Sequence, residues 1–265
     1  MSSGKVDLDD VRSYWEQHPV AAAAIPCSPD SDHYFGYYDQ LRERFEPPSF
    51  SRALHEYDSF RGKRVLDIGC GNGYVLNRYA SAGASVYGVD LTQTALRLSK
   101  RRFAISNLRG SFLVGNAEAL PFEDRSFDCV CSMGVLHHTP DTRKAVIEAR
   151  RVLKPGGKLI VMFYHRNSLQ YRVKFPMQRL FSGKSMQQSV NDVDGVGNPK
   201  GDVYSRSELR HLIGRFDQVD IFAGVSPWYK LGVAARVVPA SVREWVDRRW
   251  GWFLYAKAVG PRQEG

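Results

Sequence analysis

Residues 64–73 read RVLDIGCGNG, and this stretch decides the fold class. Its first half is a short apolar run, which is typical of a buried parallel strand. Its second half has glycine at every other position, which permits a tight turn and a close approach of the backbone to a ligand. The spacing differs from the Gly-x-Gly-x-x-Gly pattern of dinucleotide-binding folds, because the third glycine comes one residue early. The difference is consistent with a ligand that carries no phosphate at the turn.

Residues 85–90 (SVYGVD) read as the next strand, and they end in an acid. Asp90 follows Gly73 by 17 residues. A carboxylate at the tip of this strand can accept two hydrogen bonds from the hydroxyl groups of a ribose. The ordinary alternative is a surface acid near the cap of the following helix. The glycine turn upstream favours the nucleoside interpretation.

The rest of the chain alternates between strand and helix patterns. Strands are expected at residues 64–68, 85–90, 111–115, 127–132, 158–163, 218–223 and 252–258. Helices are expected at residues 8–18, 34–45, 51–60, 74–82, 92–105 with Thr92 as the cap, 142–153 and 205–215. Strands that are spaced by helices of this size form βαβ units, so the pattern predicts an α/β fold with a parallel sheet.

Five blocks, in order and at family spacing, resemble the motifs of class I, Rossmann-like S-adenosylmethionine-dependent methyltransferases with a type 11-like domain. The blocks are residues 65–73 (VLDIGCGNG), 88–90 (GVD), 116–122 (NAEALPF), 127–138 (FDCVCSMGVLHH) and 151–157 (RVLKPGG). The resemblance covers about residues 62–163. It implies a doubly wound, mostly parallel sheet of seven strands, with helices on both faces and an antiparallel last strand.

Four segments follow from this comparison and from the pattern around it. Residues 1–61 are expected to form an N-terminal helical cap, and residues 62–163 the S-adenosylmethionine-binding core. Residues 164–204 lack a regular pattern, and an irregular segment of this length is typical of an insertion that covers a substrate. Residues 205–265 are expected to complete the core sheet around a basic, aromatic insertion. That insertion contains Trp228, Tyr229, Arg236, Arg243, Trp245, Arg248, Arg249 and Trp250.

The resemblance implies that S-adenosyl-L-methionine is the cofactor and S-adenosyl-L-homocysteine the product. It assigns the ribose hydroxyls to Asp90, the methionine amino group to Asp67 and the adenine amino group to Asn116. The family usually has Asp at that last position, and an Asn carbonyl can still accept from the amine. The expected cofactor residues are Asp67, Gly69, Cys70, Gly71, Asn72, Gly73, Asp90, Leu91, Asn116, Ala117, Met133 and Gly134.

The acceptor side is predicted from position in the chain. His137 and His138 follow the fourth strand at the edge where open α/β sheets bind ligands, so either imidazole is a candidate general base. A structural role is the alternative for both, because such a pair recurs in the family with varied substrates. Aromatic residues of the cap and of the fifth strand are candidates for substrate contact, although aromatic residues are often core. These candidates are Tyr14, Trp15, His18, Tyr34, Tyr38, Tyr164 and His165.

Composition excludes several classes of protein. Hydrophobic residues make up 43% and charged residues 25% of the 265 residues, an ordinary globular balance. No apolar run approaches the roughly 20 residues of a membrane span. Residues 1–7 have no apolar stretch of the kind found in signal peptides, so we expect a cytoplasmic protein. The four cysteines have no zinc spacing, which predicts a reduced protein without a metal site.

The leading hypothesis is in-line methyl transfer to a small-molecule acceptor, with the oligomeric state left open. RNA, protein or a lipid-like quinone precursor are alternative acceptors, because residues 166–265 carry a net charge of +7 and several tryptophans. The same basic excess is also typical of an ordinary solvated surface. A non-catalytic cofactor-binding module and a nicotinamide oxidoreductase are the alternatives from other classes. The early third glycine and the motif blocks argue against the oxidoreductase.

Overall fold

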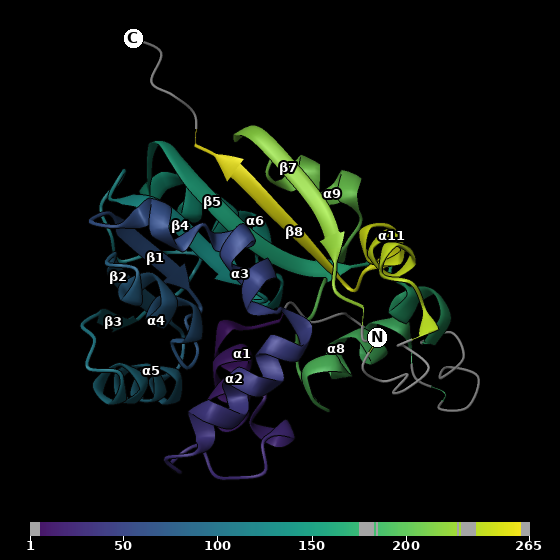
Figure 1. Ribbon diagram of the computed structural model, residues 1–265, viewed down its shortest axis with the longest axis horizontal. Coiled ribbons are helices and arrows are strands. Elements are labelled where there is room, and N and C mark those ends of the chain that lie inside the picture. Colours follow the sequence, from purple (N-terminus) through teal and green to yellow (C-terminus); the bar gives the residue numbers. More distant parts are fainter. Residues whose placement is uncertain (1–5, 175–182, 184, 227, 229–236, 261–265) are drawn as a thin grey trace.

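The computed structural model describes residues 6–174, 183, 185–226, 228 and 237–260. One mixed sheet runs through the molecule in the order β3-β2-β1-β4-β5-β8-β7 (Figure 1). Its strands are β1 (Arg64–Ile68), β2 (Ser85–Asp90), β3 (Ser111–Val114), β4 (Phe127–Met133), β5 (Leu153–His165), β7 (Asp217–Gly224) and β8 (Phe253–Val259). The first five pair in parallel, and β8 runs antiparallel to both β5 and β7. The predicted antiparallel last strand is confirmed.

The predicted number of seven strands was wrong by one. An eighth strand, β6 (Val203–Tyr204), pairs in parallel with the end of β5. Two residues are too few to give a periodic pattern in the sequence, which explains why this strand was not predicted. It lies in the segment 164–204, so it connects the expected insertion to the carboxyl end of β5.

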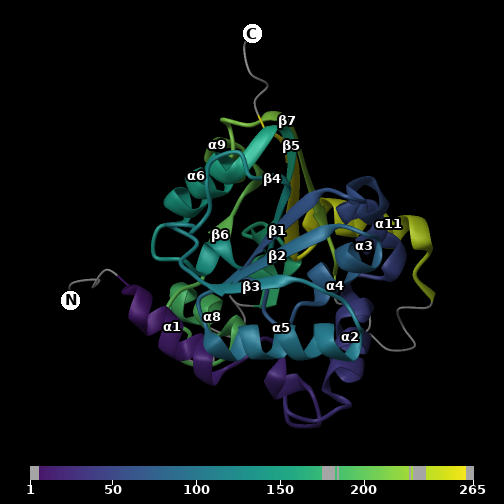
Figure 2. The ribbon, with the colours of Figure 1, turned by 90° about the vertical axis from the view of Figure 1, so that its left-hand side faces the viewer.

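Helices cover both faces of the sheet, as predicted (Figure 2). On one face lie α4 (Tyr74–Ser81) and α5 (Gln93–Ile105), and on the other lie α6 (Thr142–Val152) and α9 (Arg206–Leu212). Successive side chains of a strand point to opposite faces. Accordingly, Val65 packs in the apolar cluster under α4, whereas Leu66 packs in the cluster under α6. The buried run of β1 therefore supports two cores at once.

The N-terminal segment is helical, as expected for a cap. Its elements are α1 (Leu8–Gln17), η1 (Ala22–Ala24), α2 (Tyr34–Phe45), α3 (Pro48–His55) and η2 (Tyr57–Phe60). The helix expected over residues 51–60 begins earlier and breaks at Glu56, which adopts a φ of 50°. The Glu56 carboxylate pairs there with Lys158 and Lys257. These long-range ion pairs accompany the break, and the local sequence contains no sign of them.

The expected insertion is more ordered than the sequence pattern indicated. It contains a π-helical turn η4 (Gln170–Lys174), α8 (Met186–Asn191), η5 (Asp192–Asp194) and β6. Ser185 and Gln188 form a capping box at the start of α8. A capping box is a sequence-level signal for a helix start. The irregular-loop prediction for this segment was therefore wrong at α8.

The basic, aromatic insertion between the last two long strands contains α11 (Ala240–Trp250). Trp245 is 58% exposed on it, and Arg248 pairs with Glu244. Tyr229, Arg236 and the first five residues of the chain lie outside the described residues. Within the part of the chain that the structure describes, no helix is long and apolar enough to cross a membrane.

Candidate functional site

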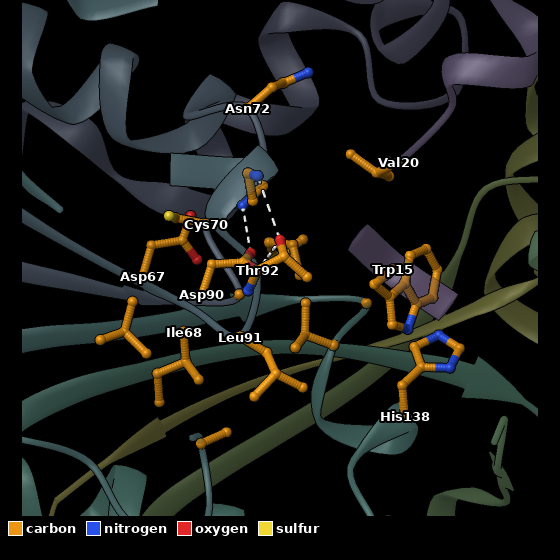
Figure 3. Close-up of a pocket in the computed structure, with 18 of the residues that line it drawn as sticks. Trp15, Val20, Asp67, Ile68, Cys70, Asn72, Asp90, Leu91, Thr92 and His138 are labelled. Atoms are coloured by element: carbon orange, nitrogen blue, oxygen red, sulfur yellow. Dashed lines mark hydrogen bonds between the residues drawn. The ribbon is translucent and has the colours of Figure 1, made fainter. Parts of the chain in front are cut away.

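A pocket lies at the carboxyl ends of β1, β2 and β4, where open α/β sheets bind ligands (Figure 3). The turn after β1, the loop after β3 and helix α1 complete its wall. All but one of the expected cofactor residues line it, namely Asp67, Gly69, Cys70, Gly71, Asn72, Asp90, Leu91, Asn116, Ala117, Met133 and Gly134. The exception is Gly73, which starts α4 and packs against Ser99 instead.

The glycine turn needs its glycines for two separate reasons. Gly69, Gly71 and Gly73 all have positive φ, between 54° and 77°. Residues other than glycine rarely adopt this backbone conformation. A Cβ atom on Gly69 would also lie 2.3 Å from Cγ2 of Val135, a residue of the pocket wall. The turn therefore brings backbone atoms, and no side chains, close to the pocket at Gly69 and Gly71.

The Asp90 carboxylate closes the turn and faces the pocket. Its Oδ2 accepts a hydrogen bond from the Gly71 amide at 3.0 Å. Its Oδ1 accepts two more, from the amide and the hydroxyl of Thr92, at 3.0 and 2.9 Å. Burial raises the pKa of Asp90, and these hydrogen bonds counteract that rise. A carboxylate has about four lone-pair positions, so about one remains for a ligand.

Asp67 offers the pocket a buried carboxyl group with one unpaired oxygen. Its side chain is buried, at 3% exposure, and Oδ1 has no hydrogen-bond partner among the described residues. Burial raises the pKa of Asp67 to about 7, and the nearby charge of Asp90 adds to this rise. A buried carboxylate oxygen without a partner is costly. A cationic or N–H-bearing ligand group would remove that cost.

Arg42, on α2, lines the same pocket and was not predicted. Its Nε and one Nη donate to Oε2 of Glu46 at 3.0 and 2.6 Å, and Glu46 is itself buried. Glu46 also accepts a 2.6 Å hydrogen bond from Tyr255 on β8. A guanidinium has five N–H donors, so three remain beyond those given to Glu46. The sequence signal was the spacing of four between Tyr38, Arg42 and Glu46, which places all three on one helix face.

The far end of the pocket is formed by the loop after β3. Asn116 accepts a 2.9 Å hydrogen bond from the Glu118 amide through Oδ1, which leaves that oxygen one further lone pair. Leu91 and Ala117 supply apolar surface beside it. This part of the wall combines apolar surface with a hydrogen-bond acceptor, as a planar, amine-bearing ring requires.

The two histidines predicted as candidate bases differ in position. His137 lies outside the pocket lining and is fully buried, and burial holds the pKa of His137 well below its usual value. His138 lines the pocket beside Trp15 (Figure 3). Its Nδ1 lies 2.5 Å from the carbonyl oxygen of Lys200, and its Nε2 lies 3.3 Å from Oδ2 of Asp194. Both ring nitrogens of His138 therefore lie within 3.3 Å of protein oxygens, and only Nδ1 has hydrogen-bond geometry.

The aromatic candidates are only partly brought together. Trp15 and Tyr38 line the pocket. The residues outside its lining are Tyr14, His18, Tyr34, Tyr164 and His165. Tyr34 is fully buried in the core, and Nδ1 of His165 lies 2.9 Å from the carbonyl oxygen of Gly251. Burial lowers the pKa of His165. These two residues hold the fold together around the site.

Helix α1 forms an apolar wall that was not predicted in detail. Leu8, Val11 and Trp15 line the pocket from one helix face, followed in the chain by Pro19 and Val20. The spacing of three and four residues is the helical period, so the signal was present in the sequence. What the sequence lacked was any sign that this face meets the pocket. Figure 3 shows Trp15 and Val20 on the side opposite to Asp67 and Asp90.

Comparison with known proteins supports the motif analysis. Residues 66–161 match the family model of a methyltransferase domain. The chain is 35% identical to a ubiquinone biosynthesis O-methyltransferase of Ralstonia nicotianae, over 51% of this chain and 62% of that protein. It is 33% identical to the protein of the same name from Thiobacillus denitrificans, over 51% of this chain and 63% of that protein. The chain thus covers less than two thirds of the length of these relatives.

Solved structures extend the likeness to the whole fold. Magnesium protoporphyrin IX methyltransferase from Synechocystis PCC 6803, solved with bound SAH, has a TM-score of 0.65 at 18% identity, covering 96% of this chain and 99% of that chain. The [4+2]-cyclase SpnF has a TM-score of 0.58 at 19% identity, covering 92% of this chain and 87% of that chain. Residues 66–161 therefore match a methyltransferase domain, and the chain shares its overall fold with solved methyltransferases and with this cyclase.

Proposed function

We propose that this protein transfers a methyl group from S-adenosylmethionine to a small-molecule acceptor. The observation that carries the proposal is the unpaired, buried oxygen of Asp67 beside the glycine turn. An amino acid ligand supplies the ammonium group that this oxygen lacks. The methyltransferase domain match over the same residues supports the same ligand.

The charged groups of the pocket fit the amino acid part of this cofactor. Asp67 would accept from the ammonium group through Oδ1. Arg42 would donate to the carboxylate through N–H groups that Glu46 does not use. Charge-assisted hydrogen bonds of this kind are about twice as strong as neutral ones. The pocket thus presents a carboxylate and a guanidinium to the two charged groups of a zwitterionic ligand.

The nucleoside part fits the other end of the pocket. Asp90 has about one lone pair to offer to a ribose hydroxyl, and a second contact requires it to exchange one of its protein donors. Asn116 would accept from the adenine amino group through its remaining lone pair. Leu91 and Ala117 would pack against the ring. The predicted roles of these residues are therefore retained as parts of this proposal.

When bound, the cofactor supplies a methyl group that its sulfonium already makes electrophilic. The residues then have to orient the acceptor in line with that group and exclude water. Met133 and Gly134 would border the reacting centre, and α1 would cover the pocket and exclude water from it. We infer that neither histidine acts as the base in the closed pocket. His137 lies outside its lining, and His138 has Nδ1 at the Lys200 carbonyl oxygen and Nε2 at 3.3 Å from the Asp194 carboxylate.

The wall contributed by α1 favours an apolar acceptor. Leu8, Val11, Trp15 and Val20 present no charge to the pocket. Relatives of the chain are named as O-methyltransferases of ubiquinone biosynthesis, so a hydroxyl group on a ring is the second, more specific candidate for the acceptor. The apolar wall gives RNA or an acidic peptide no cation to contact, and it therefore disfavours both as the group that enters.

Binding and turnover test this proposal separately. Calorimetry with S-adenosylhomocysteine (SAH) and with NAD should give binding for the first ligand alone. Binding of NAD without SAH would contradict the assignment of the ligand. Radiolabelled S-adenosylmethionine, incubated with a panel of catechols, phenols, amines and RNA, should label the phenolic compounds. A protein that binds SAH and labels none of these would instead support the non-catalytic module. The [4+2]-cyclase neighbour shows that this fold carries other activities as well.

A further inference from the structure

Asp194, the last residue of η5, contacts three separate parts of the molecule. Its Oδ1 accepts a 2.6 Å hydrogen bond from the hydroxyl of Tyr164, at the end of β5. Its Oδ2 lies 3.3 Å from Nε2 of His138, which follows β4. Its backbone carbonyl accepts a 3.1 Å hydrogen bond from the hydroxyl of Tyr14, on α1. One residue of the insertion thus connects the sheet edge with the helix that walls the pocket.

The connection to the sheet edge is firm. Tyr164 and His138 are both buried, at 6% and 4% exposure. The insertion makes a second contact with His138 through the carbonyl oxygen of Lys200. Strand β6 adds backbone pairing between the insertion and β5. The segment that carries Asp194 is therefore attached to the core independently of α1.

The connection to α1 depends on a close approach of backbone to ring. Gly195 has a φ of 132°, and a Cβ atom there would lie 2.2 Å from the Tyr14 hydroxyl oxygen. The ring of His18 stacks on Tyr14, with centroids 4.4 Å apart and an interplanar angle of 17°. Tyr14 is thereby held between its own helix and the insertion. A side chain at position 195 would separate the two.

Among the described residues, helix α1 has few other contacts that hold it in place, one of them the edge-on packing of Trp15 on the ring of His138. It buries only Val11 and Tyr14. Its other polar anchor is Glu16, which accepts hydrogen bonds from the backbone amides of Gln93 and Thr94 at 2.9 Å each. Those amides belong to the start of α5, next to Asp90. Two polar attachment points, one at each side of the pocket, thus supplement the packing of α1, and elements with few buried contacts open locally at low cost.

We propose that α1 is a lid over the pocket and that Asp194 and Gly195 form the clasp that keeps it closed. Leu8, Val11 and Trp15 are its inner face, so its departure opens the pocket along one side. The clasp joins the lid to residues 164–204, which follow the core in the chain. Closure of such a lid excludes water and sets the rate of ligand release in many enzymes. Only the identity of the ligand rests on the proposed function.

Amide hydrogen exchange on the full chain without ligand tests the clasp. Gly195→Ala places a methyl group against Tyr14, whereas Gly197→Ala adds one to a glycine with a φ of 89° and no atom within 4 Å. Both variants place alanine at a positive φ, and only Gly195→Ala brings the new methyl group against Tyr14. We expect the amides of residues 11–17 to exchange about tenfold faster in the first variant, with α4 unchanged, and to be unaffected in the second. Equal exchange of α1 in both variants would overturn the proposal.

Tyr14→Phe removes the hydrogen bond to Asp194 and leaves the ring. Its matched control is Tyr37→Phe, which removes a hydroxyl from a side chain that is 44% exposed. Exchange of α1 should rise about fivefold in Tyr14→Phe alone, and release of SAH, measured by competitor chase, should accelerate by a similar factor. Unchanged exchange in Tyr14→Phe refutes the clasp even where Gly195→Ala does not fold. If the wild type fails to bind SAH, the proposed function is lost and the exchange result still decides the clasp.

Discussion

Asp67→Asn is expected to stabilise the fold at pH 8 and to weaken the proposed cofactor site at the same time. Burial raises the pKa of Asp67 from 3.8 to about 7. A native-state pKa above the unfolded-state value means that the native protein binds this proton more tightly, so ionisation of Asp67 opposes folding. The destabilisation is absent below about pH 4, grows as the pH rises towards 7, and is constant above that.

The magnitude follows from the size of the shift. One pKa unit corresponds to about 1.4 kcal/mol, so about three units amount to about 4 kcal/mol at pH 8, as an upper bound. At pH 5 the same shift amounts to about 1.5 kcal/mol. The side chain is 3% exposed, so solvent screening reduces these figures little. Relative to the variant, the wild type should therefore lose about 2–3 kcal/mol of unfolding free energy between pH 5 and pH 8.

Urea unfolding at the two pH values measures this difference. Asp128→Asn is the matched control, because it removes a carboxylate of opposite behaviour. Burial raises the pKa of Asp128, but hydrogen bonds from Lys154 and from the backbone of Arg64 lower it overall. The stabilisation by Asp128 is present above its unfolded-state pKa and is lost only as the pH falls below it. The difference in unfolding free energy between the wild type and Asp128→Asn should therefore be nearly equal at pH 5 and pH 8. Equal differences for Asp67→Asn as well would refute the reasoning.

The same titration predicts how ligand binding depends on pH. The ammonium group of SAH requires the ionised form of Asp67, which makes up only about a tenth of the free protein at pH 6. Affinity should therefore be about tenfold weaker at pH 6 than at pH 8 in the wild type. Calorimetry on Asp67→Asn should give an affinity that is lower at pH 8 and independent of pH over this range. A wild-type affinity that is flat over the same range would contradict the assignment of the ammonium group.

Three further substitutions test separate parts of the site. Asp90→Ala should weaken SAH binding by about 2 kcal/mol in calorimetry, and unchanged affinity would refute the ribose assignment. Gly69→Ala should lower the unfolding free energy by about 2 kcal/mol more than Gly156→Ala. Both glycines have positive φ, but only a methyl group at position 69 would contact another residue, Val135. Equal urea midpoints for the two variants would contradict the packing argument. Arg42→Gln should lower the unfolding free energy by about 3 kcal/mol, since it leaves Glu46 buried and unpaired. Arg42→Gln combined with Glu46→Gln should recover stability and not SAH affinity, and recovery of both would exclude Arg42 as a ligand.

The fold was predictable where local sequence determines it. The alternation of residues 64–163 gave the parallel strands and their helices, because each element has its own period and its own turn residues. The prediction was wrong at α8 and β6. The two-residue strand β6 takes its place from pairing with β5, and the six-residue helix α8 is too short to show a helical period, although its capping box was a signal in the sequence. Glu56 is a second example, since Lys158 and Lys257 lie about a hundred residues or more away along the chain.

The side of the pocket formed by the sequence motifs was predictable, and the side formed by the N-terminal cap was not. The motif residues lie within or just after strands of one sheet, so the topology alone gathers Asp67, Asp90 and Asn116 at one edge. Arg42 and the inner face of α1 reach the same pocket from a cap that packs across it, and no spacing in the sequence specifies where a cap docks. Asp194 is the extreme case, because its role depends on contacts with three distant elements.

The distribution of charge along the pocket has a chemical consequence in the proposed binding mode. Both carboxylates, Asp67 and Asp90, lie where the amino acid and the ribose would bind, whereas Met133, Gly134 and Val135 border the reacting centre without charge. Transfer of the methyl group removes the positive charge of the sulfonium. A fixed negative charge beside the sulfur would stabilise the bound reactant more than the transition state and would slow the reaction. In this mode the pocket would bind the donor through Asp67, Asp90 and Arg42 and leave the residues that border the reacting centre uncharged, which is the arrangement that differential binding of the transition state requires.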